Sequence, residues 1–266
     1  MKIGIVGCAG RMGRMLVAET AKTSGCEIGG GTDLPGSAFV GKDIALVAGL
    51  EECGIAIGDD PKALFTDVDA VIDFTTPAAT LKHAALAAET GTVLVIGTTG
   101  LSADQKAELA KAAEKTAIVF APNMSVGVNL AFALVEKVAA ILDKDTADIE
   151  IVEMHHKHKV DAPSGTALGL GEAAARGRGV ALDDVAVRSR DGHTGAREDG
   201  AIGFATLRGG DVVGDHTVVF ACEGERIEIT HKASSREVFA KGAMRAAKWA
   251  FGKDAGLYSM QDILGL

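Results

Sequence analysis

The stretch Lys2-Ile3-Gly4-Ile5-Val6-Gly7-Cys8-Ala9-Gly10-Arg11-Met12-Gly13 decides the fold of the first half of the chain. Its apolar run predicts a strand over 2–6, and its three glycines lie in a turn that opens a predicted helix over 11–23. Glycines at such a turn let the backbone approach a pyrophosphate, whose charge is stabilised by the N–H groups of the helix start. The spacing G-x-x-G-x-x-G departs from the commoner G-x-G-x-x-G. The alternative is therefore a strand-to-helix turn that binds no ligand.

Asp33 follows Gly13 by 20 residues, the distance at which a dinucleotide fold places an acceptor for the adenosine ribose. Further strands are predicted over 27–32, 70–74, 93–96 and 118–121. Thr76-Pro77 and the capping box of Ser102 with Gln105 begin two of the helices between them. Alternating strands and helices indicate a doubly wound parallel sheet over residues 1 to about 125.

The pattern changes after Gly127. We expect helices over 129–142 and 165–175, and strands over 149–154, 202–208, 217–222 and 226–231. The last three strands have no helix between them, which favours a mostly antiparallel sheet. Ser234 with Glu237 is expected to cap a final helix that ends near Phe251. The predicted fold class is α/β, with a Rossmann-type parallel sheet followed by an α+β domain.

Composition excludes several classes of protein. The 266 residues are 47% hydrophobic and carry a net charge of −9, which repels nucleic acid and anionic membrane surfaces. The four cysteines form no C-x-x-C pair, and the apolar run over 3–8 is too short for a secretory signal. The uncharged stretch 116–135 is interrupted by Pro122 and Asn123, so we expect strand, loop and helix there instead of a membrane span. These features favour a cytoplasmic protein with reduced thiols.

Two loops follow neighbouring strands of the predicted sheet. They are Gly97-Thr98-Thr99-Gly100 and Ala121-Pro122-Asn123-Met124-Ser125. Ligands of open α/β sheets lie outside the carboxyl ends of the strands, and small residues there would let a nicotinamide ring lie close to the backbone. Ordinary connecting loops are the alternative.

The densest cationic cluster is His155-His156-Lys157-His158-Lys159, followed by Val160-Asp161-Ala162-Pro163-Ser164-Gly165-Thr166. Ser164 is a good N-cap, so the N–H groups of Gly165 and Thr166 could bind one carboxylate while a histidine or lysine neutralises a second. We therefore expect a dicarboxylate site, with histidine as acid or base. A solvated basic turn is one alternative. A zinc site at His156 and His158 is a weaker one, because no third ligand stands at metal spacing.

A further polar string, Ser189 to Arg197, is punctuated by glycines and predicts an exposed loop. Its arginines could face an anion or another subunit.

Together these residues resemble the 4-hydroxy-tetrahydrodipicolinate reductase family, formerly called dihydrodipicolinate reductases, over essentially the whole chain. The resemblance depends on the following segments: G-C-A-G-R-M-G at 7–13, D-F-T-T-P at 73–77, G-T-T-G at 97–100, N-M-S-V-G-V-N at 123–129, H-H-K-H-K-V-D-A-P-S-G-T at 155–166, G-H-T-G at 192–195 and T-H-K-A-S-S-R at 230–236. The run at 155–166 is the most specific of these.

The resemblance implies a dinucleotide-binding domain of residues 1–126 plus 236–266, and a substrate-binding and tetramerisation domain of residues 127–235. It implies a homotetramer that reduces 4-hydroxy-tetrahydrodipicolinate, a cyclic imine dicarboxylate, to tetrahydrodipicolinate with NADH or NADPH in lysine and diaminopimelate biosynthesis.

The resemblance also implies residue roles. His155 is expected as acid/base and Lys159 as proton donor, with His156, Gly165 and Thr166 binding the substrate and no metal. The cofactor contacts it implies are Gly7, Cys8, Ala9, Gly10, Arg11, Met12, Gly13, Asp33, Gly97, Thr98, Thr99, Ala121, Pro122, Asn123 and Met124.

Cofactor preference follows from Asp33. Its carboxylate would accept from a ribose hydroxyl and repel a 2′-phosphate, and Leu34 stands where many family members have arginine. Thr76 departs from the family in the same way. Lys42 and Arg11 are the nearby cations, and Arg11 is assigned to the pyrophosphate. We expect NADH to be preferred, with residual use of NADPH.

The chemistry agrees with these roles. Loss of the 4-hydroxyl leaves a conjugated imine, and hydride delivery to C4 then creates an electron-rich enamine that must be protonated beside cations. Two rivals remain at this stage, a non-catalytic NAD(H) sensor and an amino-acid dehydrogenase on a similar fold.

Overall fold

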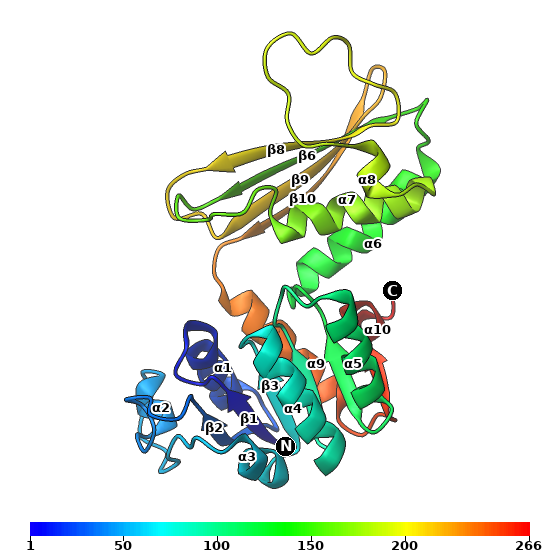
Figure 1. The fold of residues 1–266 in the computed structure, drawn as a ribbon. Helices are drawn as coiled ribbons and strands as arrows, with labels where there is room; N and C mark the ends of the chain where they lie inside the picture. Colours follow the sequence, from blue (N-terminus) through cyan, green and yellow to red (C-terminus); the bar gives the residue numbers. More distant parts are fainter. The chain divides into compact units, whose positions relative to one another are not determined.

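The computed structural model describes all residues from Met1 to Leu266, and they form two compact units (Figure 1). The first unit combines Met1–Ser125 with Glu237–Gly265, and the second is Val126–Arg236. The first unit is therefore discontinuous in sequence, because its last helix and strand return from the far end of the chain.

The first unit is built on a six-stranded sheet. The spatial order is β11-β5-β4-β3-β1-β2, and every neighbouring pair is parallel. The strands are β1 (Lys2–Val6), β2 (Glu27–Thr32), β3 (Ala70–Asp73), β4 (Val93–Ile96), β5 (Ala117–Phe120) and β11 (Gly256–Tyr258). The chain reverses direction across the sheet beside β1, which is the topological switch point of a doubly wound fold.

Helices cover both faces of this sheet (Figure 1). On one face α3 (Pro61–Asp67), α4 (Pro77–Thr90) and α5 (Ala103–Ala113) pack side by side, and on the other α1 (Arg11–Lys22) packs against α9 (Glu237–Ala250). Two short helices, α2 (Ile44–Val47) and α10 (Met260–Leu264), complete the unit. The predicted caps are confirmed, because Thr76 caps α4 and Ser102 forms a capping box with Gln105 at α5.

The second unit packs two helices on one face of a five-stranded sheet. The helices are α6 (Val126–Ile141) and α7 (Gly165–Arg178), with a short α8 (Leu182–Val185). The strands are β6 (Asp148–His155), β7 (Ala186–Val187), β8 (Ile202–Arg208), β9 (Gly214–Ala221) and β10 (Arg226–Ala233), in the order β10-β9-β6-β8-β7. Inward side chains of β6 and β9 form the core with alanines of α7, whereas no helix of this unit covers the opposite face.

The fold class is confirmed, and the sheet of the second unit is more mixed than the strand run suggested. β6 lies between β8 and β9, pairing antiparallel with β9 and parallel with β8. The final helix begins at Glu237, so Ser234 lies outside its first turn. The stretch 116–135 forms β5, a loop and the start of α6 as predicted. No helix in the chain combines the length and apolarity that a bilayer crossing requires.

Candidate cofactor and substrate sites

The glycine turn after β1 has a geometry that other residues cannot adopt without strain. Gly7 has a φ of +65°, in the left-handed region that favours glycine. A Cβ at Gly13 would overlap the carbonyl oxygen of Gly7, so α1 can pack this closely on the turn only without a side chain there. Gly10 is the N-cap and donates its own N–H to Gly7 O over 3.0 Å.

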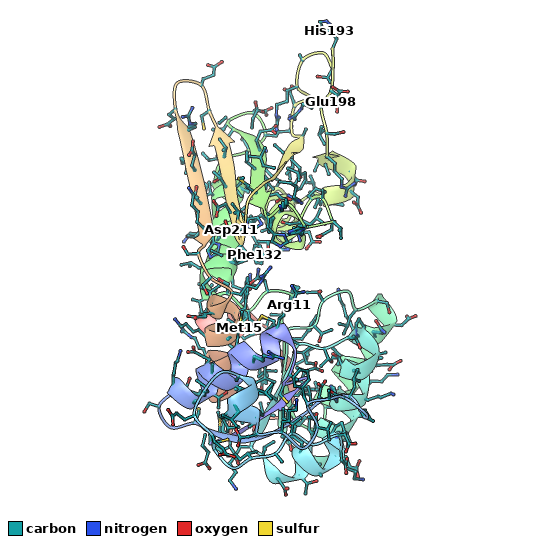
Figure 2. All side chains as sticks on the ribbon, turned by 90° about the vertical axis from the view of Figure 1, so that its left-hand side faces the viewer. Arg11, Met15, Phe132, His193, Glu198 and Asp211 are labelled. Atoms are coloured by element: carbon teal, nitrogen blue, oxygen red, sulfur yellow. The ribbon has the colours of Figure 1, made fainter.

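The start of α1 fits an anion. Gly10 provides no side-chain cap to the first-turn N–H groups, and no acidic residue occupies that turn. Arg11 is exposed at the first helical position, one turn before Met15 (Figure 2). An uncapped helix N-terminus beside a cation is the arrangement that binds a pyrophosphate. The predicted cofactor residues Gly7, Gly10, Arg11, Met12 and Gly13 therefore come together in one turn.

Cys8 and Ala9 occupy the buried side of the same turn. The Cys8 N–H donates to Thr32 O over 3.0 Å, so this N–H serves the link between the turn and β2. Burial, with a further contribution from the Asp33 carboxylate, raises the pKa of the Cys8 thiol to about 12. Cys8 is therefore a protonated packing residue at physiological pH.

Asp33 follows β2 directly and is already engaged by its own loop. Its carboxylate accepts from Leu34 N over 2.9 Å and from Ser37 Oγ over 2.7 Å. A carboxylate has lone pairs for further donors, so it can still accept from a ribose hydroxyl. In the same loop the Phe39 ring has Arg14 5.0 Å and Lys42 5.2 Å from its centroid. Arg14, which the sequence analysis did not name, therefore joins Lys42 as a cation of this region.

The loop after β4 lies on a buried polar network. The Asp73 carboxylate, fully buried at the end of β3, contacts His83 Nδ1 at 2.8 Å and accepts from Thr75 Oγ at 2.6 Å. Thr98 Oγ donates to the same carboxylate over 3.3 Å and accepts from Thr80 Oγ over 2.9 Å. Burial alone would raise the pKa of Asp73, but hydrogen bonds from His83 and Thr75 hold it below its ordinary value.

Gly97 is also fixed by contact, because a Cβ there would overlap the Phe74 ring. Its N–H donates to Asp73 O over 2.9 Å. The loop after β5 is held similarly, since Ala121 N donates to Ile96 O over 3.1 Å and Asn123 Oδ1 accepts from Ser125 N over 2.9 Å. Thr99 follows Thr98 in its loop, and Pro122 and Met124 flank Asn123 in the other. Both loops therefore stand at the carboxyl edge of the sheet, beside the glycine turn.

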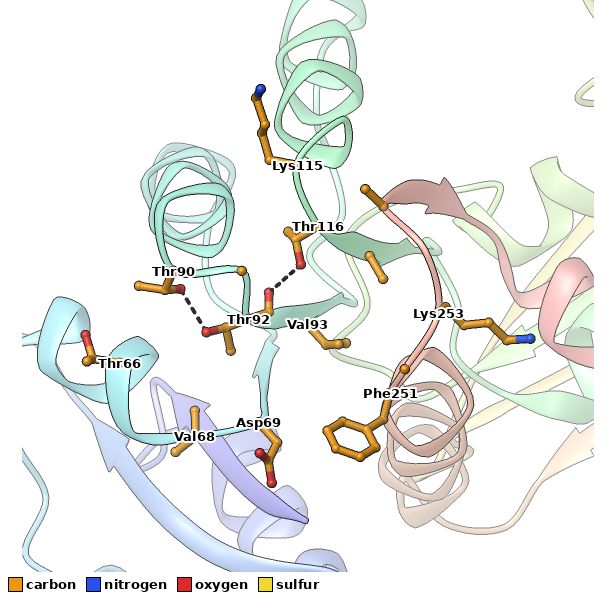
Figure 3. A pocket seen from close by; sticks show the side chains of 14 residues that line it. Thr66, Val68, Asp69, Thr90, Thr92, Val93, Lys115, Thr116, Phe251 and Lys253 are labelled. Carbon is orange, nitrogen blue, oxygen red and sulfur yellow. Dashed lines mark hydrogen bonds between the residues drawn. The ribbon is translucent and has the colours of Figure 1, made fainter.

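A cavity of about 410 Å³ opens at the opposite, amino-terminal edge of the same sheet (Figure 3). Its threonines bond within the protein, with Thr90 Oγ 2.8 Å from Thr92 Oγ, and Thr116 Oγ donating to Thr92 O over 3.1 Å. None of the predicted cofactor residues lines it. This cavity is thus unrelated to the glycine turn.

The second unit gathers the predicted catalytic residues at the end of β6. His155 is the last residue of that strand and is buried, with its Nδ1 2.6 Å from Glu153 Oε2. Burial lowers the pKa of His155, and the nearby cations Lys159 and Arg208 lower it further, against the opposing effect of Glu153. His155 is therefore mainly neutral at pH 7.

Glu153 is the centre of this cluster and is 1% exposed. Arg208 binds it with two nitrogens, at 2.8 and 3.0 Å, and Ser164 N donates to it over 3.0 Å. Burial alone would raise the pKa of Glu153, but the hydrogen bonds from Arg208 and His155 hold it below its ordinary value. Glu153 is therefore an ionised, buried carboxylate beside the predicted acid/base.

The start of α7 lies against the same cluster. Ser164 caps the helix by accepting from Ala167 N over 3.1 Å, and its Oγ lies 3.0 Å from His216 Nε2. Gly165 is exposed and Thr166 half-buried at the first two helical positions. Burial lowers the pKa of His216 to about 4, so this histidine is neutral and adds no charge to the helix start. The first turn of α7 can thus receive an anion.

The other residues of the cationic run differ in their surroundings. Lys159 Nζ lies 2.9 Å from Asp161 Oδ1, and His156 Nε2 lies 3.3 Å from Arg236 Nη2. Lys157 and His158 are exposed. Because β6 ends at His155, His156 and His158 lie in a loop and do not share a strand face. No group of three or more histidine, cysteine or acidic side chains is arranged to hold a metal ion.

The arginines of the polar string face the chain's own carboxylates. Arg190 binds both oxygens of Glu150, at 2.9 and 2.8 Å, and Arg197 bonds to Glu150 and Asp148. The string forms a loop at the end of the unit opposite Asp211, as the positions of His193 and Glu198 show (Figure 2). In this chain these arginines are therefore neutralised at the start of β6, the far end from His155.

Sequence reasoning missed Glu153, Arg208 and His216. Glu153 could have been predicted from the sequence, because residues two apart on a strand share a face and Glu153 therefore lies beside His155. Arg208 and His216 lie on strands β8 and β9, far from His155 in the sequence. Only the pairing of those strands with β6 brings them to the cluster.

Two family models match the chain. "Dihydrodipicolinate reductase, N-terminus" matches residues 1–124, and "Dihydrodipicolinate reductase, C-terminus" matches residues 127–264. The chain belongs to the dihydrodipicolinate reductase family. The boundary between the two matched regions coincides with the start of α6.

Relatives within the dihydrodipicolinate reductase family match over nearly their whole length. The 4-hydroxy-tetrahydrodipicolinate reductase of Magnetococcus marinus is 54% identical over 265 residues, which cover 100% of this chain and 98% of the relative. The protein named 4-hydroxy-tetrahydrodipicolinate reductase 1 in Mesorhizobium japonicum is 56% identical over 266 residues, covering 100% and 97%.

The fold is also that of a solved family member. A dipicolinate-bound dihydrodipicolinate reductase from Paenisporosarcina sp. TG-14 superposes with a TM-score of 0.76 at 24% identity, and 98% of each chain is covered. A probable dehydrogenase from Thermotoga maritima gives a TM-score of 0.64 at 12% identity, with 99% of this chain and 92% of that chain covered. The fold is thus shared at low sequence identity.

Proposed function

We propose that the protein reduces 4-hydroxy-tetrahydrodipicolinate to tetrahydrodipicolinate with NAD(P)H, as an enzyme of lysine and diaminopimelate biosynthesis. Relatives that are 54 to 56% identical over the whole chain carry the name of this activity. The observation that carries the proposal is the cluster at the end of β6. There a neutral buried histidine and a lysine lie beside the start of α7, whose first turn has no acidic residue. A non-catalytic NAD(H) sensor would have no use for that cluster.

The first unit is proposed to bind the cofactor. The glycine turn, the start of α1 and the loops after β4 and β5 fit a dinucleotide, because all of them lie at the carboxyl edge of the sheet. When bound, the dihydronicotinamide supplies the hydride, which is chemistry that no side chain provides. The protein residues align the ring and neutralise the pyrophosphate charge.

The second unit is proposed to bind the substrate and handle its proton. The N–H groups of Gly165 and Thr166 bind one carboxylate of the substrate, and His156 contributes to the second. Hydride addition at C4 of the conjugated imine moves an electron pair onto the imine nitrogen and C5, and one proton completes the net addition of H₂. Lys159 is the proton donor and His155 its acid/base partner, as the surrounding charges stabilise the developing negative charge.

NADH is proposed as the preferred cofactor. Asp33 offers an acceptor for a ribose hydroxyl, and its charge disfavours a 2′-phosphate. Arg14 on α1 and Lys42 both lie over the Phe39 ring and give NADPH a means of residual binding.

The uncovered face of the second sheet supports a homotetramer. The side chains that β6, β8 and β9 direct away from α6 and α7 include Val152, Met154, Ala205, Leu207 and Val219. An apolar sheet face without a covering layer is typical of an interface between subunits. We propose that tetramers form through this face and that the enzyme acts in the cytoplasm.

The proposed function is tested with freshly prepared product of dihydrodipicolinate synthase. The expected result is consumption of NADH that depends on this substrate. An amino-acid dehydrogenase would instead reduce NAD⁺ in the presence of an amino acid and ignore the imine. Absence of NADH consumption with the correctly prepared substrate would contradict the proposal.

A further inference from the structure

Glu153 and His155 form a pair whose protonation the geometry determines. Glu153 Oε2 lies 2.6 Å from His155 Nδ1, and no other partner of that nitrogen is present. Because Glu153 is ionised and bound by Arg208 and Ser164 N–H, its oxygens can only accept hydrogen bonds. The proton of the contact must therefore lie on His155 Nδ1.

A neutral imidazole carries one proton. If that proton is on Nδ1, then Nε2 has a free lone pair and acts as an acceptor or base. His155 Nε2 makes no hydrogen bond in this structure, and the backbone of β9 leaves the space next to it empty, since the adjacent residue is Gly214. A Cβ at Gly214 would lie 2.9 Å from Nε2.

The groups around His155 come from four strands and one loop. Glu153 precedes it on β6, Arg208 is its register partner on β8, and His216 on β9 has its ring centroid 5.0 Å away. Lys159 lies in the loop after β6 and contributes positive charge, and His231 on β10 is the register partner of His216. Only Glu153 among them is an anion facing the ring, so the Nδ1 proton has a single acceptor.

We propose that Glu153, clamped by Arg208, is a positioning residue that fixes His155 as the Nδ1–H tautomer with Nε2 as the acceptor in the reaction. This inference rests on the proposed function and deepens it, because it divides the roles of the two catalytic residues. His155 cannot donate from Nε2 while neutral, so the proton that completes the reduction comes from Lys159. His155 Nε2 accepts a proton or hydrogen bond from Lys159 or from the substrate.

The direct test is ¹⁵N NMR of the imidazoles in the full chain labelled at histidine. The His155 signals are assigned by their loss in His155→Gln. The expected pattern at neutral pH is a protonated Nδ1 and an unprotonated Nε2. A protonated Nε2 in the wild-type protein would overturn the proposal, whatever the enzyme's activity.

Glu153→Gln tests whether the Glu153 carboxylate determines the tautomer of His155. The glutamine amide can donate to Nδ1 and so favours the opposite tautomer, with loss of the Nδ1–H signal. Since the Glu153 carboxylate raises the pKa of His155, its removal should lower that pKa. We expect the fall of kcat/KM on acidification to move to lower pH, and kcat on the plateau to decrease roughly tenfold or more. An unchanged tautomer and pH profile would contradict the proposal.

Glu150→Gln is the matched control. Glu150 lies on the same strand and points to the opposite face, and two arginines bind it where one binds Glu153. It should leave the His155 tautomer and the pH profile unchanged. Equal shifts of both in the Glu150 and Glu153 variants would indicate a general effect of charge on β6 and refute a specific positioning role.

Two further variants keep the test independent of folding. Arg208→Lys retains the charge but loses the bidentate contact with Glu153. We therefore expect a smaller loss of kcat than in Glu153→Gln, with the Nδ1–H tautomer kept.

Gly214→Ala leaves Glu153 untouched and places a methyl group against His155 Nε2. The value of kcat should fall at least as far as in Glu153→Gln while the Nδ1–H signal persists. Full activity of Gly214→Ala would show that Nε2 is not the reacting nitrogen. If the wild type lacks reductase activity, the proposed function fails while the NMR result still decides the tautomer.

Discussion

At the scale of single residues, the two ends of the cationic run have different electrostatic environments. His155 is enclosed by Glu153, Arg208 and His216, whereas Lys157 two residues later is exposed to solvent. A catalytic group needs partners that fix its position. The exposed side chain of Lys157 has no such partners in this structure. The distinction between neighbours in one run follows from where β6 ends.

We predict that His155→Gln lowers kcat by roughly a hundredfold, the usual contribution of a positioned acid or base. Lys159→Ala should be comparably harmful, and Lys157→Ala nearly silent. Steady-state kinetics with the imine substrate measures all three. Equal losses at Lys157 and His155 would mean that the run acts only as a diffuse positive field.

Cofactor choice also belongs to this scale. Leu34 is 76% exposed beside the Asp33 carboxylate, so an arginine there has room to reach a 2′-phosphate. We predict that the wild type has a higher kcat/KM for NADH than for NADPH, and that Leu34→Arg shifts the ratio toward NADPH. Both values are measured at matched ionic strength. Equal or better use of NADPH by the wild type would refute the preference.

At the scale of elements, we propose that two helix starts bind anions by different means. The start of α1 has a glycine cap and no side-chain bond, whereas α7 has Ser164 as a cap and presents Gly165 and Thr166. Pyridine-2,6-dicarboxylate should compete with the substrate at α7, and Thr166→Val should weaken it. Inhibition constants measure both effects. Equally tight binding of picolinate, which has one carboxylate, would contradict the two-carboxylate model.

The ends of β3, α4 and β4 are joined by the buried Asp73 network. Because the pKa of Asp73 is lowered in the folded protein, its contribution to stability is full above the unfolded value near pH 4 and is lost as pH falls through the folded pKa. We predict that Asp73→Asn destabilises the protein by about 3 kcal/mol at pH 7, and by much less in strong acid. Denaturant unfolding at both pH values measures this. A pH-independent cost would exclude the ionised Asp73 carboxylate as its source.

Elements with strong local signals were predictable from sequence, and those created by pairing were not. The bounds of β1, β2, β4 and β8 agree with the prediction, because each strand ends at a polar residue or directly before a glycine. The three residues of β11 form a strand only by pairing with β5. Arg208 lies 55 residues from Glu153, and the place of β6 between β8 and β9 is likewise a long-range property that no local pattern contains.

At the scale of the whole molecule, the second unit leaves one sheet face without a covering layer. Val152 stands on the central strand β6, and its register partners are Ala205 on β8 and Thr217 on β9. All three point away from α6 and α7, because the alternate residues of the same strands form the core on the helix side. A lysine at position 152 would be tolerated by a solvated face but not by an apolar interface.

We therefore predict that Val152→Lys dissociates the proposed homotetramer without unfolding the chain. Sedimentation equilibrium should give four times the chain mass for the wild type and a smaller species for the variant, while circular dichroism stays unchanged. Leu46→Lys is the control, because Leu46 is an exposed apolar side chain on α2 of the first unit. A tetramer that persists in Val152→Lys would place the interface elsewhere, since burying an unpaired ammonium costs several kcal/mol per subunit, enough to break a contact that repeats around the assembly.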